Sequence, residues 1–151
     1  MSIAIGIAMA VAMCLAARFI GFDRDRAFYP VLLIAIASYD LVFAALTQDA
    51  GVIVAEFLLA MVFIVMAVIG FRKWPVLVLL GLVGHAAADV VHPHMIANGG
   101  IPAWWPGFCA GFDVATAVVF GFLLYAAIHA ESHEKIDPLS KVAVERSGQA
   151  K

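Results

Sequence analysis

GVIVAEFLLAMVFIVMAVIGF, residues 51–71, is the stretch that decides the fold of this chain. It holds one ionisable residue, Glu56, and as a helix it would be about 30 Å long, which matches the hydrocarbon thickness of a bilayer. Four further apolar stretches of similar length accompany it. We therefore predict an all-α, polytopic membrane helical bundle with five transmembrane helices, at residues 2–22, 30–47, 51–71, 74–92 and 104–128.

The composition of the whole chain agrees with this class. Of 151 residues, 65% are hydrophobic and 13% charged, and the mean hydropathy is +1.03, so a soluble domain of this size could not bury the apolar surface. No basic residue precedes the first apolar run, so we expect a retained span and not a cleaved signal peptide. We predict a transmembrane domain at residues 1–128 and a polar cytoplasmic tail at residues 129–151.

The basic residues fall on alternate connections between the predicted spans. Three arginines lie at the first connection, Arg72 and Lys73 at the third, and the other four basic residues in the tail, whereas the second and fourth connections have none. Cytoplasmic loops are enriched in Lys and Arg, so the pattern predicts an outer N-terminus and a cytoplasmic C-terminus. The loops near Asp49 and His94 would then face outward.

Several ionisable residues interrupt the apolar spans at one depth, in the predicted outer half. Each would cost roughly 2.5 to 3.5 kcal/mol at the bilayer centre, and no Lys or Arg lies in that half to pair with them. Three agents could balance the negative charge: protons on the acids, a bound metal ion with neutral histidines, or a cationic substrate. The residues concerned are Asp40, Glu56, His85, Asp89, His92 and Asp113.

The fourth predicted span carries the motif that favours a metal. His85, Asp89 and His92 follow one another at i, i+4 and i+7, which is one face of a helix. Imidazole and carboxylate are ordinary ligands of zinc, our first choice, and also suit copper, iron and manganese. Glu56 and Asp113 would either complete the ligand shell or hold the ring nitrogens of the histidines. We predict a divalent-metal site made of Glu56, His85, Asp89, His92 and Asp113.

Three further residues have less defined places. Asp40 follows a serine and a tyrosine and could be a structural hydrogen-bond partner, so we rank it last among the acids. Pro93 disfavours helix at the residue before it, which should release His94 into the loop. Cys109 is either an addition to the site or a small packing residue.

Residues 93–106 form the one long outward connection, and their glycines and prolines predict a shaped loop. The loop joins the two spans that carry most of the ionisable residues. We interpret it as a lid over the site, with an interfacial loop held by Trp104 and Trp105 as the competing interpretation.

Three stretches also resemble a known family. DRAFYP at residues 25–30, GHAAADVVHPH at residues 84–94 and IPAWWPGFCAGFD at residues 101–113 are similar to DUF6010, a family of small bacterial integral membrane proteins of unknown function. The resemblance runs from about the second span to the fifth. It implies a multi-pass protein of the bacterial cytoplasmic (inner) membrane and implies no activity. Asp40 is not part of the family pattern.

Two classes of function follow from the predicted site. One is a metal-dependent hydrolase that acts on a membrane amphiphile; the other is a non-enzymatic metal-handling, proton-relay or transport component, and the sequence leaves open whether the protein is an enzyme. The expected partners are the lipid bilayer, an amphiphilic small molecule and a second copy of the chain. Gly107 and Gly111 form a small-residue face on the fifth span that would permit close helix contact, either within the chain or between two copies of it. No basic stripe for nucleic acid is present.

Overall fold

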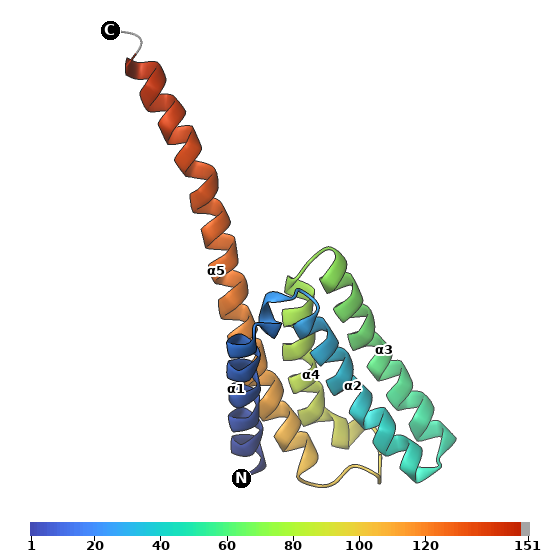
Figure 1. The fold of residues 1–151 in the computed structure, drawn as a ribbon. Helices are drawn as coiled ribbons and strands as arrows, with labels where there is room; N and C mark the ends of the chain where they lie inside the picture. Colours follow the sequence, from blue (N-terminus) through green and yellow to red (C-terminus); the bar gives the residue numbers. More distant parts are fainter. Residues whose placement is uncertain (149–151) are drawn as a thin grey trace. The chain divides into compact units, whose positions relative to one another are not determined.

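The computed structural model describes the backbone of residues 1–148 and the side chains of residues 1–130 and 132. This part of the chain is helical and contains no strand. The chain divides into two units, residues 1–120 and residues 121–151. The elements are α1 (Ser2–Ile20), η1 (Phe22–Arg24), α2 (Phe28–Thr47), α3 (Ala50–Arg72), α4 (Val76–Met95) and α5 (Trp105–Gly148) (Figure 1).

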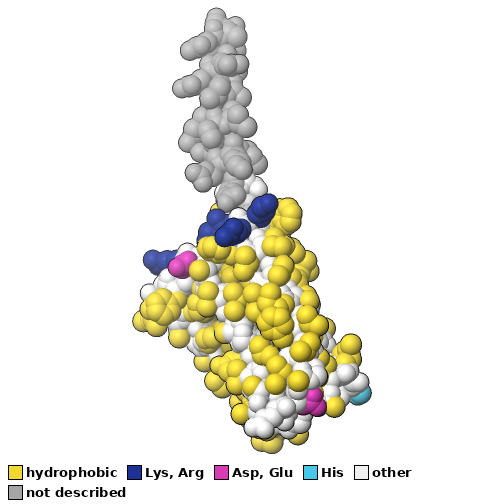
Figure 2. Space-filling model, turned by 90° about the vertical axis from the view of Figure 1, so that its right-hand side faces the viewer, with side chains coloured by type: hydrophobic (Ala, Val, Ile, Leu, Met, Phe, Trp, Pro, Cys, Tyr) yellow, Lys and Arg dark blue, Asp and Glu magenta, His cyan; other side chains and the backbone are white. Residues whose placement is uncertain are grey.

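All five α-helices have the length and composition of membrane spans. Their mean hydropathy ranges from 1.6 in α4 to 3.0 in α3, and the candidate span in α5 covers Trp105–Ala130. Figure 2 shows hydrophobic side chains over the flank of the coloured part of the chain and Lys and Arg side chains gathered toward one end of that part. The prediction of an all-helical protein with five apolar helices is confirmed, and the first four helices differ from the predicted bounds by no more than three residues.

The predicted polar tail is only partly described. The backbone of α5 stays helical as far as Gly148, well past the boundary predicted at residue 128. The side chains of residues 131 and 133–151, which make up most of the tail, lie outside the described residues. The domain boundary therefore stays a prediction.

A tight turn between α2 and α3 sets the depth of two acids. Gln48 ends α2 with a left-handed φ of 56°, and the Asp49 side chain caps α3 by accepting hydrogen bonds from the amides of Gly51 and Val52 at 2.8 and 3.2 Å. Asp40 and Glu56 are equally far from Gln48 along the sequence. Because the rise per helical residue is constant, the two antiparallel helices bring both acids to the same level.

Glycines let α1 pack closely against the start of α5. A Cβ added to Gly111 would overlap the backbone of Ile3, and one added to Gly107 would lie 2.7 Å from the Ser2 Oγ. On the opposite helix, a Cβ on Gly6 would overlap the backbone of Phe108. The small-residue face predicted on the fifth span is therefore covered by α1 within the chain, as one of the two alternatives for Gly107 and Gly111 required.

The end of α4 differs from the sequence prediction. Pro93 lies inside the helix, which continues to Met95, and the Ile96 amide donates to the His92 carbonyl at 3.0 Å. Proline removes one donor and disfavours the helical conformation before it, yet a single further turn forms because the hydrogen bond to His92 bypasses the proline. The prediction that His94 lies in the loop is wrong, since this residue is helical and exposed.

Candidate metal centre

Six buried ionisable side chains form what we call the polar layer of the first unit. Their exposed fractions range from 0% for Asp113 to 8% for Asp40. A further carboxylate, that of Asp23 at the turn after α1, has a side chain only 2% exposed and pairs with Arg18. No described Lys or Arg is buried. The polar layer consists of Asp40 on α2, Glu56 on α3, His85, Asp89 and His92 on α4, and Asp113 on α5.

Helix α4 supplies half of the layer from one face. His85, Asp89 and His92 are all buried, whereas Val90 between them is 66% exposed, as the i, i+4, i+7 spacing predicts. The ring of Phe63 from α3 packs edge-on against the His85 ring, with the centroids 4.8 Å apart. The imidazole is thereby held between an aromatic ring and the acids.

His85 lies between two carboxylates. Its Nδ1 is 2.7 Å from the Asp113 Oδ2 on α5 and 3.6 Å from the Asp89 Oδ2 one turn along its own helix. The shorter contact is a hydrogen bond in which the ring nitrogen donates to the carboxylate. Asp113 therefore fixes the orientation of the His85 ring from a different helix.

His92 forms the second imidazole–carboxylate contact. Its Nε2 lies 2.7 Å from the Glu56 Oε1 on α3. The same oxygen accepts a hydrogen bond from the Asn98 Nδ2 at 2.8 Å, and this amide group also donates to the Asp40 backbone carbonyl at 3.1 Å. Glu56 thus joins α3, α4 and the loop after α4.

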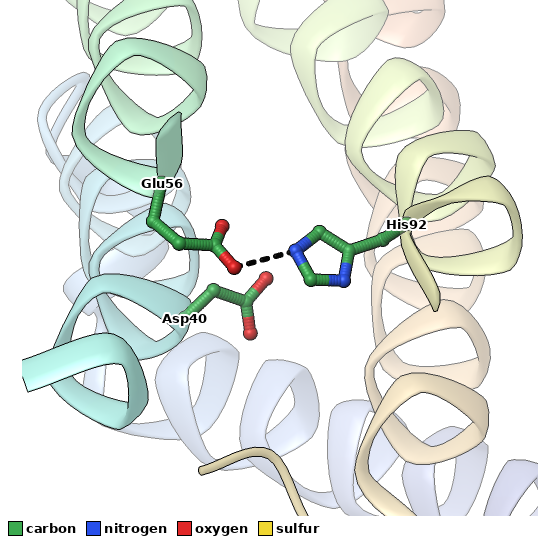
Figure 3. Close-up of side chains that lie close together, drawn as sticks. All are labelled: Asp40, Glu56 and His92. Atoms are coloured by element: carbon green, nitrogen blue, oxygen red, sulfur yellow. Dashed lines mark hydrogen bonds and ion pairs between the residues drawn. The ribbon is translucent and has the colours of Figure 1, made fainter. Parts of the chain in front are cut away.

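Two sets of three side chains in the layer are close enough to hold a metal ion. In each set one potential ligand atom per residue lies within 4.8 Å of the others. The first set is Asp40, Glu56 and His92, whose polar ends point toward one another in Figure 3. The second set is Asp40, His85 and Asp89. Asp40 belongs to both.

Asp40 is therefore a candidate ligand, although the prediction from sequence ranked it last among the acids and left it out of the site. Its side chain is buried, and its carboxylate faces Glu56 and His92 from the other side of the α2–α3 turn (Figure 3). The surrounding sequence of Asp40 says nothing about which neighbours its helix face meets. The depth match with Glu56 was the signal that could have placed it.

Three carboxylate oxygens in the layer are buried without a hydrogen-bond partner among the described residues. They are the Glu56 Oε2, the Asp89 Oδ2 and the Asp113 Oδ1. A buried oxygen that bears part of a negative charge and has no donor is costly, because its hydration is lost and nothing replaces it. These atoms have free coordination capacity that a cation would use.

The other predicted residues have separate places. Asp113 belongs to neither set of three, and its contact is to the His85 ring, which matches the alternative that it holds a ring nitrogen. His94 is exposed, outside both sets. Cys109 is 5% exposed and also outside both sets.

Sequence reasoning missed Asn98. It lies in the loop between α4 and α5, where its Oδ1 also accepts the Gly100 amide at 3.1 Å. A pocket of about 480 Å³ adjoins it and is lined by His92, Pro93, Asn98 and neighbouring apolar loop residues. The predicted lid loop therefore contacts the layer through Asn98 and forms a wall of a pocket that reaches His92.

No Lys or Arg with a described side chain compensates the charge of the layer. The one ion pair that a described Lys or Arg makes joins Arg18 and Asp23 at 3.0 Å, at the turn after α1. The layer itself holds four carboxylates and two imidazoles. Its counter-charge must be protons or a ligand.

No protein-family model, curated protein or solved structure matches the chain. Membership of DUF6010 therefore stays a prediction from three stretches of sequence. The function of the protein must consequently be inferred from the geometry of the polar layer.

Proposed function

We propose that the protein is an integral membrane protein that binds divalent metal at the polar layer. The observation that carries this proposal is the convergence of Asp40, Glu56 and His92 from three helices, with their ligand atoms within 4.8 Å. Imidazole nitrogen and carboxylate oxygen together suit zinc first and iron, manganese or copper next. The partnerless oxygens of Glu56 and Asp89 support the fit, because each is a buried acceptor without a donor.

The hydrogen bond between His92 and Glu56 is compatible with this reading. In a tetrahedral zinc site with ligand bonds near 2.0 to 2.1 Å, neighbouring donor atoms are roughly 3.3 Å apart. The observed 2.7 Å between the His92 Nε2 and the Glu56 Oε1 is the spacing of a shared proton. An ion would replace that proton after the two atoms separate by about half an ångström.

The chemical role we favour is hydrolysis of a membrane amphiphile. A divalent ion supplies Lewis-acid activation of water and polarises an ester, amide or phosphate bond. The pocket beside His92 is lined by Ile96, Ile101 and Pro102, which suit an acyl chain, while His92 and Asn98 contribute polar groups to the same lining. A carboxylate of the layer that is left uncoordinated would act as general base.

A non-enzymatic role has its own supporting observation. The two hydrogen bonds of 2.7 Å between imidazole and carboxylate would also hold protons in a structural network or a proton relay. Transport across the whole membrane has less support, because Asp23, which also has a buried side chain in the described part of the bundle, lies at the turn after α1 and is paired with Arg18. A polar route to the far side would need unpaired groups between this turn and the layer.

The membrane setting belongs to the same proposal. The alternation of basic connections supports an outer N-terminus and a cytoplasmic C-terminus, which puts the layer in the outer half. The three motif stretches support a place in DUF6010 and, with it, the bacterial inner membrane.

Metal analysis of the purified protein tests the proposal. The protein is prepared in detergent without chelators, and zinc, iron, manganese and copper are quantified per chain. We expect stoichiometric metal in the wild type and its loss when His85→Ala and His92→Ala are combined. His94→Ala is the matched control, because this histidine is exposed and outside both sets, and it should keep the metal. A metal-free wild type would end the proposal, and unchanged metal in the double variant would move the site elsewhere.

A further inference from the structure

Asp40 belongs to both sets of three potential ligands, and this bears on the number of metal ions that each chain can bind. We propose that the layer binds two divalent ions, with the Asp40 carboxylate as the bridge between them; this rests on the proposed metal-binding function. One ion takes Asp40, Glu56 and His92, and the other takes Asp40, His85 and Asp89. Each ion thus has the same donor set of one imidazole and two carboxylates.

A carboxylate can bridge because it has two oxygens that point to different neighbours. Asp40 enters from α2, between Glu56 on α3 and the two histidines on α4, which are nearly two turns apart on that helix. Glu56 is hydrogen-bonded to His92 and not to His85. The two histidines therefore have separate acidic partners, and Asp40 is the group they share.

Charge balance favours two ions over one. The four carboxylates of the layer carry four negative charges when ionised, and no basic side chain among the described residues compensates them. One divalent ion would leave two negative charges buried, whereas two ions bring the layer to neutrality with both histidines neutral, the form in which imidazole binds metal. Uncompensated buried charge is strongly unfavourable, so the neutral arrangement is preferred.

Each of the two sets of three contains one buried carboxylate oxygen without a hydrogen-bond partner. The Glu56 Oε2 belongs to the first set and the Asp89 Oδ2 to the second, and both residues are at least 96% buried. A single ion at either set would leave the oxygen at the other without a partner. Asp113, whose Oδ1 is also partnerless, lies next to the second set through His85 and adds negative charge there.

Carboxylate-bridged metal pairs are a known product of helical bundles that turn acids and histidines inward. Such pairs place their ions about 3.5 to 4 Å apart and can hold both the attacking and the leaving oxygen of a substrate. The substrate class that the pair favours is therefore an amphiphile with a phosphate ester or another group that offers two oxygens to the metals. The pocket beside His92 is where such a head group would reach the layer.

Zinc stoichiometry in the full-length protein tests the bridge. Protein stripped with chelator and reconstituted in lipid nanodiscs is titrated with Zn²⁺, and bound zinc is counted per chain. The wild type and the His94→Ala control should bind two ions, while His85→Ala and His92→Ala should each bind one. Asp40→Asn should weaken the binding of both ions, by about tenfold or more, because the amide lacks the charge and the second acceptor oxygen.

The outcomes separate this inference from the function on which it rests. Two ions in the wild type together with loss at both positions in Asp40→Asn support the bridge. One ion in the wild type overturns the inference and leaves the metal-binding proposal standing, whereas a wild type that binds neither zinc nor iron, manganese or copper in the same titration ends both. If Asp40→Asn weakens only one position, Asp40 is not shared and the inference is overturned.

A measurement on the wild type alone guards against a variant that fails to fold. X-ray absorption of the zinc-loaded protein should show zinc–zinc scattering at about 3.5 to 4 Å. Absence of that scattering in protein with two bound ions would place them too far apart for one carboxylate and would overturn the bridge.

Discussion

Replacing Glu56 separates a metal site from a purely structural network. In Glu56→Ala, the His92 ring and the Asn98 amide lose the oxygen to which both donate, at 2.7 and 2.8 Å. A buried donor without an acceptor costs about 1 to 3 kcal/mol, and Asn98 is only part-buried, so its share is at the low end. We therefore expect Glu56→Ala to lower the free energy of unfolding by about 2 to 4 kcal/mol in the presence of chelator.

The conservative variant behaves differently. In Glu56→Gln the amide oxygen can accept both hydrogen bonds, and what is lost is the charge that strengthens them, which is worth about 1 kcal/mol. Zinc binding should distinguish the two variants less than stability in chelator does, because the amide oxygen of Glu56→Gln is a poor substitute for a carboxylate as a zinc ligand. Zinc at a hundred times its dissociation constant should stabilise the wild type by about 2.7 kcal/mol for each occupied site, and both Glu56 variants should lose most of the share of the site that contains Glu56.

The assay is denaturant unfolding in mixed micelles, followed by tryptophan fluorescence, with chelator and with zinc in parallel. Equal stabilisation of wild type and Glu56→Gln by zinc would show that Glu56 is not a ligand. A Glu56→Ala variant as stable as the wild type in chelator would refute the contacts of His92 and Asn98 described above. His94→Ala should follow the wild type in both conditions.

Three further predictions concern the loop, the packing and the topology. Asn98→Ala should free the α4–α5 loop, seen as faster amide exchange there, while an unchanged rate would mean that Asn98 does not hold the loop to the layer. Gly111→Val should abolish folding, because no room exists for a side chain, whereas Gly99→Ala, with nothing within 4 Å of the new Cβ, should be neutral in yield and stability. A cysteine at His94 should react with a membrane-impermeant maleimide in intact cells and one at Lys73 should not, and the reverse labelling pattern would invert the proposed orientation.

The helices were predictable because their signal is local. A run such as residues 51–71 is too apolar to be anything but buried or in lipid, and hydropathy alone finds it. The end of α4 was missed, because the rule about the residue before proline is a preference that one capped turn overrides. Local sequence also could not show that Gly107 and Gly111 face α1, since the partner of a small-residue face is a property of the whole bundle.

The candidate site was predictable to the extent that helix periodicity and depth determine it. His85, Asp89 and His92 share a face by spacing alone, and the antiparallel arrangement of spans predicted that acids from other helices would join them. The rotation of each helix about its own axis depends on its neighbours in the bundle. The sequence alone therefore could not tell whether Asp40 belongs to the candidate site or is a buried acid with a structural role. Asn98 was beyond reach, because the course of an irregular loop depends on contacts that it makes only after the helices have packed.

The choice between a proton network and a metal site depends on what lies between each imidazole and its carboxylates. Protons satisfy one oxygen at a time, which is why the Asp113 Oδ2 and the Glu56 Oε1 are hydrogen-bonded while the other oxygen of each carboxylate has no partner. A network that existed only for protons would be expected to supply donors for those oxygens, since a serine or threonine in the facing helices would suffice. Thr116 is buried three residues after Asp113 on α5, but its hydroxyl donates to the carbonyl of Phe112 on the same helix. The layer is rich in acceptors and poor in donors, and cations satisfy such an arrangement where protons alone do not.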